Sequence, residues 1–265
     1  MPEISLVLLV GVVAGTLNAV GGGGTFVALP ALVATGLSPV TANASSTIAL
    51  VPGALAGAWV YRRELAPVGG TSTSALTSTS VIGGALGAGL LLLLPSASFG
   101  AAVPWLLAFA TVLLAFGRPV SRVLSTGSTG STGSGAATGA GGAVALSPRT
   151  VLIAQFLVAV YGGYFGGAVG IMMLAFWSIG LGLDTAAGNP MRIAQIAALN
   201  LSATALFLVA SDALRTPAVL VAMLVGAVIG GFAGAHLARR LPARLLRGII
   251  LTVAVSMTVL YFLRG

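Results

Sequence analysis

The near absence of charged residues is the strongest constraint on how this chain can fold. Only 6% of its 265 residues are charged and 57% are hydrophobic, with a mean hydropathy of +1.10, whereas about a quarter of the residues in a soluble domain are charged. Apolar runs long enough for helices of roughly 20 residues recur from end to end, and they lack the alternation typical of outer-membrane strands. The sequence therefore predicts an all-α polytopic membrane protein.

The excess of basic over acidic residues indicates contact with a membrane rather than with nucleic acid. The net charge of +8 contains no lysine. The arginines cluster at predicted helix ends, where the positive-inside rule places them at the cytoplasmic face. We therefore predict multi-pass insertion in the lipid bilayer of the cytoplasmic membrane, with no nucleic-acid partner. The chain has no cysteine and one histidine, which excludes cysteine-based metal and redox sites. We expect no cofactor and no metal, and the sequence does not indicate an oligomeric state.

A low-complexity stretch divides the chain into two halves. Residues 125–147 are rich in Gly, Ser and Thr, a composition typical of flexible linkers. They separate a first repeat, 1–124, from a second, 148–265. A spacing of 146 residues superposes Asn43 on Asn189, and likewise Gly21 and Gly24 on Gly167 and Gly170; a block at 83–89 matches 230–236 at a spacing of 147. This shared order predicts an internal duplication, as in repeat-built transporters.

Each half is expected to contain five helical segments, the first two separated by a glycine break. In the fourth segment the small residues fall four apart, which favours close packing against a neighbouring helix. Ser38 before Pro39 predicts the capped start of the third segment in the first half. The predicted segments are 4–20, 25–36, 39–61, 72–94 and 99–117, then 150–166, 171–182, a helix opening at Asp184 and Thr185, 217–239 and 244–263.

The arginines predict that the two halves are inverted. They follow the third segment of the first half and flank the linker, but in the second half they lie on the turn between the fourth and fifth segments (Arg62, Arg63, Arg118, Arg122, Arg149; Arg239, Arg240, Arg244, Arg247). Inversion requires an odd number of crossings per half. A re-entrant glycine-broken hairpin plus three crossings meets this requirement, with the amino terminus outside and the linker inside. Five full crossings per half would keep the same inversion.

The glycine breaks predict an anion site. The stretch "NAVGGGGTF" at 18–26 and its counterpart "YFGGAVGIM" at 164–172 would each free backbone N–H groups at a helix start, and glycine lets an anion approach them. The alternative is that these glycines only allow tight helix packing. The third segments should line the tips with polar groups. The candidate substrate-binding residues are Asn18, Gly21, Gly22, Gly23, Gly24, Thr25, Asn43, Ser45, Ser46, Thr47, Tyr164, Gly166, Gly167, Gly170, Asn189, Arg192 and Gln195.

Arg192 is the sharpest of these candidates. A guanidinium about two turns into an apolar helix costs at least about 2.5–3.5 kcal/mol to bury in lipid. It is interpreted either as a fixed cation that receives an anionic substrate or as an arginine that snorkels to the surface or pairs with Asp184. Asn43 has two readings as well, a ligand contact or a helix–helix hydrogen bond. No HExxH or GxSxG motif occurs, so no enzymatic activity is expected.

The chain resembles the sulfite exporter TauE/SafE family of membrane permeases, also called the toluene-sulfonate uptake permease family. The resemblance rests on "LVGVVAGTLNAVGGGGTFVALPALVATGLSPVTANASSTIALVPGALAG", on "GGYFGGAVGIMMLAFWSIGLGLDTAAGNPMRIAQ" and on "GGFAGAHLARRLPARLLRG". Asn18, Val169 and Met172 are bulkier than the pattern leads one to expect.

The resemblance implies a permease for sulfur-containing anions such as sulfite, sulfonates and sulfoacetate. Together with the residues, it predicts a secondary transporter that moves a small anionic substrate through a midplane site between inverted repeats. The alternative is a non-transporting integral membrane assembly or interaction protein, in which the glycines only pack helices.

Overall fold

The computed structural model describes residues 4–21, 23–126, 146–183, 185–240 and 243–264. Most of the predicted linker, together with Gly22 and Asp184, lies outside these residues. Most of the described residues lie in helices, and the only β pairing among them is an isolated bridge between Val68 and Thr71. The predicted all-α fold class is confirmed.

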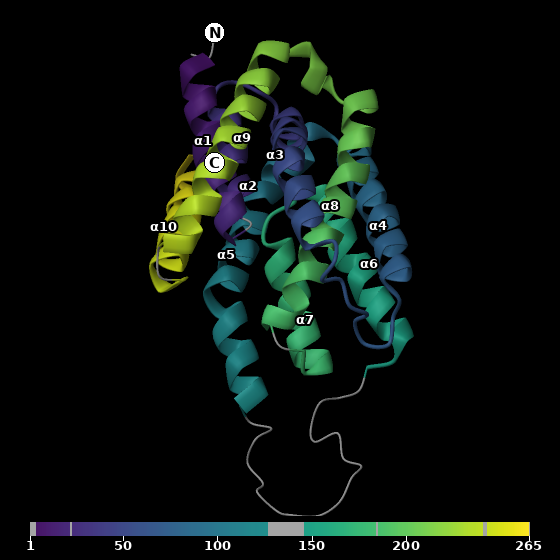
Figure 1. The fold of residues 1–265 in the computed structure, drawn as a ribbon. Helices are drawn as coiled ribbons and strands as arrows, with labels where there is room; N and C mark the ends of the chain where they lie inside the picture. The colour runs from purple at the N-terminus through teal and green to yellow at the C-terminus, as the bar shows by residue number, and fades with distance from the viewer. Residues whose placement is uncertain (1–3, 22, 127–145, 184, 241–242, 265) are drawn as a thin grey trace, which may run out of the picture.

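Within the described ranges, ten α-helices follow one another in the order expected from the two halves (Figure 1). A short 3-10 helix, η1, lies between the eighth and ninth. The bounds are α1 Ile4–Gly21, α2 Gly24–Ala34, α3 Pro39–Tyr61, α4 Thr73–Leu93, α5 Ser96–Thr126, α6 Pro148–Tyr164, α7 Val169–Leu181, α8 Thr185–Ala210, η1 Asp212–Arg215, α9 Pro217–Arg240 and α10 Ala243–Arg264.

The helix starts follow from local sequence. Ser38 precedes Pro39 at the start of α3, and its side chain accepts a hydrogen bond from the backbone N–H of Thr41 at 3.2 Å. Ser147 caps α6 in the same way before Pro148. Serine satisfies an unpaired N–H of the first turn, and proline at the first helical position has none to satisfy. The predicted cap at Ser38 is confirmed.

The outer surface of the bundle is apolar. Large hydrophobic side chains such as Leu93 and Val209 are 84% and 87% exposed, which a soluble monomer avoids over contiguous areas. Among the described residues, α3, α4, residues 96–113 of α5, residues 187–210 of α8 and residues 217–234 of α9 are long and apolar enough to cross a membrane. The protein is a multi-pass membrane protein.

The helices are arranged around two hairpins that enter the bundle from opposite ends (Figure 1). We call the end where α5 stops and α6 starts the linker end. The α1–α2 hairpin opens at the end opposite to it, where the chain begins, and α2 is followed there by a loop beside η1. The α6–α7 hairpin opens at the linker end, where Gly180 near the end of α7 lies against Leu146. Both turns therefore lie inside the bundle.

Glycines let the first helix of each half approach the fourth helix of the other. A Cβ added at Gly230 of α9 would lie 1.9 Å from the carbonyl oxygen of Val12 in α1, and one at Gly87 of α4 would lie 2.0 Å from that of Val160 in α6. No larger residue fits such backbone contacts without a shift. The close packing predicted from the four-residue glycine spacing is confirmed.

One helix is longer than predicted. The segment expected at 99–117 is α5, which continues to Thr126. The prediction ended the helix where the charged residues begin at Arg118. Arginine is a good helix former, so this boundary marks the edge of the apolar stretch rather than the end of the helix.

Candidate functional site

The two hairpin turns meet inside the bundle. Gly166 follows α6 with a left-handed φ of +84°, and a Cβ added to it would lie 3.5 Å from Oγ1 of Thr25 in the first turn of α2. Thr25 is buried. Glycine tolerates this backbone conformation at no steric cost, so the sequence "FGG" permits the sharp turn that brings the two predicted tips together.

The helices that leave these turns start without side-chain caps. Gly23 is the N-cap of α2 and Ala168 is the N-cap of α7, and neither makes a side-chain cap hydrogen bond. Ala168 has φ of +58°, and it is the one non-glycine residue with positive φ in the described chain. Such a conformation costs an alanine roughly 1–2 kcal/mol. Two helix starts without side-chain caps are thus buried inside the bundle, and the first N–H groups of a helix have no partner within the helix itself.

Asn43 ties α3 to the second turn. Its Nδ2 donates a hydrogen bond to the backbone carbonyl of Tyr164 at 3.0 Å, and the side chain is fully buried. The ring of Tyr164 points elsewhere, packing edge-on against Phe99 of α5 with ring centroids 5.3 Å apart. Asn43 therefore makes the predicted helix–helix hydrogen bond, and Tyr164 contributes its carbonyl rather than its phenol to the turn.

Arg192 lies over the first turn of α7. Its Nε and one terminal nitrogen donate to Oδ1 of Asn189 at 3.1 and 2.7 Å. A Cβ added at Gly170 would lie 2.6 Å from another terminal nitrogen of Arg192. The predicted residues Asn189, Arg192 and Gly170 are therefore brought together. The guanidinium adds a full positive charge where the helix N-terminus already carries a partial one.

The first turn is shaped by packing at Gly24. A Cβ there would lie 2.6 Å from the carbonyl oxygen of Ala14 and 3.0 Å from Cβ of Asn18, so the half-buried Asn18 lies against the start of α2. Gly21 ends α1. In the second turn, a Cβ at Gly167 would lie 2.6 Å from the ring of Phe165. Gly24 and Gly167 therefore allow other protein groups to approach closely.

The remaining predicted residues lie around this centre or beyond it. Ser45 and Ser46 are buried in α3, Thr47 is half-buried beside them, and the Ser46 hydroxyl donates to the backbone carbonyl of Asn43 at 2.9 Å. Gln195 is buried, but its Nε2 contacts Oγ1 of Thr77 on α4 at 3.2 Å and Sδ of Met191 in its own helix at 3.1 Å. The Nε2 group of Gln195 therefore contacts α4 and its own helix rather than the two turns.

A buried polar contact between α4 and α6 was not predicted. Nε2 of Gln155 donates to Oγ of Ser80 at 2.8 Å, and both side chains are buried. With Gln195 and Thr77 it forms a polar seam along α4. A single amide or hydroxyl in an apolar segment has no spacing pattern that identifies its partner. A lone glutamine such as Gln155 in an apolar run could nevertheless have indicated a buried polar contact.

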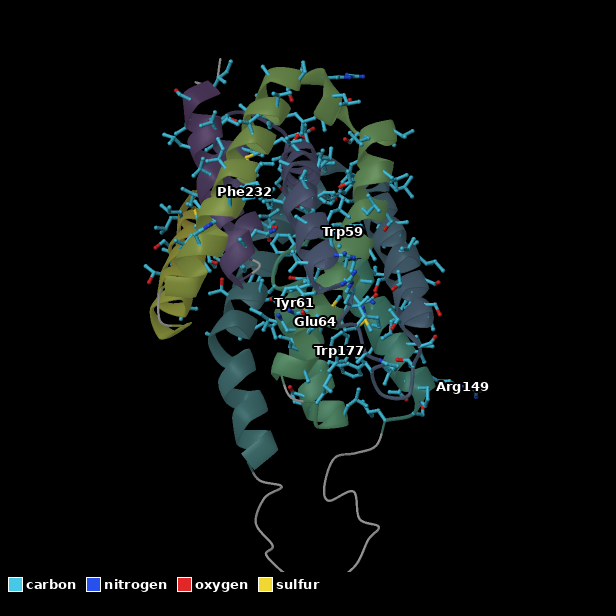
Figure 2. The ribbon with its side chains drawn as sticks, in the orientation of Figure 1. Trp59, Tyr61, Glu64, Arg149, Trp177 and Phe232 are labelled. Atoms are coloured by element: carbon cyan, nitrogen blue, oxygen red, sulfur yellow. The ribbon has the colours of Figure 1, made fainter. Side chains whose placement is uncertain are left out.

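The two ends of the bundle differ in charge. The exposed residues Arg62, Arg63 and Glu64 follow α3 in the half of the bundle nearer the linker end, and the exposed Arg149 lies at the linker end; Glu64 and Arg149 are labelled in Figure 2. Arg62 also stacks over the ring of Trp59, at 4.0 Å from its centroid. At the opposite end Arg215 is paired with Asp212 at 3.0 Å. The excess of basic residues toward the linker end is typical of a cytoplasmic face.

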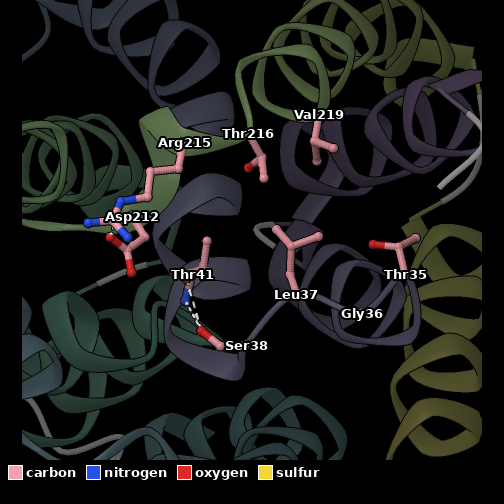
Figure 3. A pocket seen from close by; sticks show the side chains of 9 residues that line it. All are labelled: Thr35, Gly36, Leu37, Ser38, Thr41, Asp212, Arg215, Thr216 and Val219. Carbon is pink, nitrogen blue, oxygen red and sulfur yellow. Dashed lines mark hydrogen bonds and ion pairs between the residues drawn. The ribbon is translucent and has the colours of Figure 1, made fainter. Parts of the chain in front are cut away.

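A shallow pocket of about 330 Å³ opens at the end opposite the linker (Figure 3). The loop between α2 and α3 and the segment around η1 form its walls. Its hydroxyl groups contact the protein itself, as in the hydrogen bond between Thr35 and the carbonyl of Leu32 at 2.7 Å. No cluster of three or more metal-ligating side chains occurs in the part of the chain that the structure describes.

Comparison with known proteins agrees with this architecture. No curated protein and no solved structure matches the chain significantly. The sequence model of the family described as Sulfite exporter TauE/SafE matches residues 7–261, which is nearly the whole chain. The extent of this match confirms the resemblance seen in the sequence. The all-helical membrane bundle with two broken helix pairs at its centre agrees with it. The chain therefore belongs to the sulfite exporter TauE/SafE family of membrane transporters.

Proposed function

We propose that this protein moves a small anion of the sulfur-containing class (sulfite, sulfonate or sulfoacetate) across the cytoplasmic membrane, through a site where the two hairpin turns meet. The observation that carries the proposal is the position of Arg192 over Gly170. A cation beside a helix N-terminus is unfavourable by itself, because both are positive. An anion placed between them would be stabilised by both, in the bidentate geometry that arginine favours.

The burial of the two turns supports a binding site rather than a surface contact. Thr25 and Asn43 are buried, and so is Gly170 in the first turn of α7. Electrostatic interactions are stronger in such an environment than in water. An anion that leaves water needs this compensation, and uncapped helix starts with a guanidinium supply it without a bound metal.

We further propose that the two halves are duplicated, inverted repeats that expose the site alternately. Three observations support this. The hairpins open at opposite ends of the bundle (Figure 1). If α1 to α5 are matched in order with α6 to α10, the helix contacts recur. Helix α1 packs against α9, and their counterparts α6 and α4 pack against each other. Finally, Oγ1 of Thr111 and Oγ1 of Thr258, which are 147 residues apart in sequence, lie 3.1 Å from each other, as residues near a twofold axis do.

The direction of insertion follows from charge. We place the linker end in the cytoplasm, because Arg62, Arg63 and Arg149 lie in the half of the bundle nearer to it while Arg215 at the other end is paired with Asp212. In this orientation the α1–α2 hairpin re-enters from outside and the α6–α7 hairpin from inside. Repeat-built transporters place their sites where such broken helices meet.

The second candidate is a non-transporting membrane assembly protein, and Gly24 is the observation that favours it. Its missing side chain is needed for contact with Ala14, so this glycine has a packing role without any ligand. Under this alternative no anion stabilises the protein, and replacing Arg192 changes no ligand response.

Thermal stability of the purified protein tests the proposal. Sulfite, sulfoacetate, taurine, sulfate and chloride are compared in wild type, Arg192→Ala and Arg215→Ala, the last being a matched control on an exposed ion pair. A ligand at about 100 times its Kd adds roughly 2.7 kcal/mol to the free energy of unfolding. We expect at least one sulfur anion to raise the Tm of wild type and Arg215→Ala but not of Arg192→Ala. No response to any anion would favour the assembly protein.

A further inference from the structure

The side-chain carbonyl of Asn43 is a buried acceptor without a donor. Because Nδ2 donates to the carbonyl of Tyr164, the orientation of the amide is determined, and Oδ1 cannot face that carbonyl. Oδ1 is buried and has no hydrogen-bond partner among the described residues. An unsatisfied buried polar atom is costly, and in a native structure it calls for an explanation.

The asparagine at the same place in the other half has its acceptor satisfied. Asn189 lies 146 residues after Asn43, and its Oδ1 accepts two hydrogen bonds from Arg192. The residue 146 positions before Arg192 is Ser46, whose hydroxyl donates to the backbone carbonyl of Asn43 instead. One asparagine is thus paired with a cation, while the other keeps a free carbonyl oxygen.

Asn43 lies beside the proposed site, because its amide contacts the second hairpin turn. Its partner Tyr164 ends α6, two residues before Gly166, which lies against Thr25 of the opposite turn. The guanidinium of Arg192, which belongs to α8, contacts the same hairpin at Gly170. The same turn is therefore contacted by a positive donor, Arg192, and by a side chain with a neutral buried acceptor, Asn43.

We infer that Asn43 is a specificity-determining residue, which selects anions that carry their own O–H donor over anions of the same size that carry none. This inference rests on the proposed function, since it assumes that the anion binds between the turns. An amide oxygen only accepts hydrogen bonds, so it repels the bare oxygen of an anion and attracts a hydroxyl. A protonated oxyanion or a hydroxysulfonate would satisfy both sides, with its charge at Arg192 and its hydroxyl at Asn43.

The test compares two sulfonates of equal heavy-atom count, hydroxymethanesulfonate and ethanesulfonate. They differ in a hydroxyl against a methyl group. Affinities are measured from the concentration dependence of the Tm of the full-length protein, with sulfite as a third ligand. In wild type we expect hydroxymethanesulfonate to bind roughly tenfold more tightly than ethanesulfonate, because only the first ligand satisfies the buried acceptor. This comparison needs no variant, so it is independent of whether any substitution folds.

Two variants assign the preference to Asn43. In Asn43→Leu the acceptor is removed, and we expect the ratio of the two affinities to fall to about one. Gln155→Leu is the matched control, because it also removes a buried amide from a helix contact but lies between α4 and α6. We expect it to keep the wild-type ratio.

The outcomes separate the inference from the function it rests on. Equal or reversed affinities in wild type overturn the inference, and so does a preference that survives in Asn43→Leu. If sulfite stabilises the protein in an Arg192-dependent manner but neither sulfonate binds, the inference fails and the anion site stands. If no anion binds, the proposed function fails as well.

Discussion

The two hairpin turns occupy similar positions in the fold, but the residues in and around them differ. The first, from Gly21 to Thr25, is neutral, and Gly24 is held there by backbone contact with α1. The second carries the left-handed residues Gly166 and Ala168 and lies under Arg192. Both turns contribute a helix N-terminus, but a fixed charge, that of Arg192 in α8, lies beside the second turn only. The comparison teaches that, under the proposed duplication, two similar hairpins form an asymmetric site.

Substitutions at Gly24 and Gly170, which lie 146 residues apart, test the difference between the two turns most directly. A Cβ at Gly24 meets the backbone of Ala14, which cannot move away without displacing α1. We expect Gly24→Ala to lower the free energy of unfolding by about 1–3 kcal/mol. Thermal or denaturant unfolding measures it. Gly53→Ala is the control, because nothing lies within 4 Å of a Cβ at that position of α3; an equal loss in both variants would contradict the packing role of Gly24.

The polar seam along α4 is a second difference between the two halves. Gln155 and Ser80 form a buried pair, whereas the positions 146 before Gln155 and 147 after Ser80 are Leu9 and Ala227. We expect Gln155→Leu to cost about 1–3 kcal/mol, because it leaves the hydroxyl of Ser80 unpaired. The double variant with Ser80→Ala should recover part of the loss, as a double-mutant cycle of unfolding free energies can show. Additive losses would mean that the two side chains are not coupled.

At Gly170 the expected effect is on affinity rather than on folding. An added Cβ meets the end of the flexible side chain of Arg192, which can shift. We expect Gly170→Ala to keep the Tm within a few degrees of wild type while weakening anion binding about tenfold. Ligand-dependent Tm shifts check both quantities in the same experiment. Unchanged affinity would show that the position of the guanidinium over Gly170 does not matter for binding.

The smallest expected effect concerns the helix caps of the two turns. Ala168 has φ of +58° where Gly23 has −97°. Glycine has no steric penalty in the left-handed region, so Ala168→Gly should raise the free energy of unfolding by about 1 kcal/mol. A change of this size is visible as a Tm increase of a few degrees. A decrease would mean that the strain at Ala168 is compensated by packing of its methyl group.

Most of the fold could be predicted because the elements are long and strongly apolar. The start of α3 follows from Ser38 and Pro39. The end of α5 could not be read in this way, because helical propensity does not stop where hydropathy does.

The candidate site was predicted less completely. Asn43, Arg192 and Gly170 could be named from residue type, because polar groups in lipid and glycines at a break are rare and costly. Their contacts depend on how α7 packs against α8 and how α3 reaches the other half, which periodicity does not encode. The seam of Gln155 and Ser80 escaped prediction for the same reason.

Transport in reconstituted proteoliposomes tests the central claim most directly. Uptake of labelled sulfite is measured for wild type, Arg192→Ala and Arg149→Ala, the last an exposed arginine at the linker end. We predict that Arg192→Ala loses at least about 90% of the flux, corresponding to roughly 1.4 kcal/mol or more, while Arg149→Ala stays near wild type. A folded Arg192→Ala protein that carries sulfite at the wild-type rate would contradict an anion site built on this arginine.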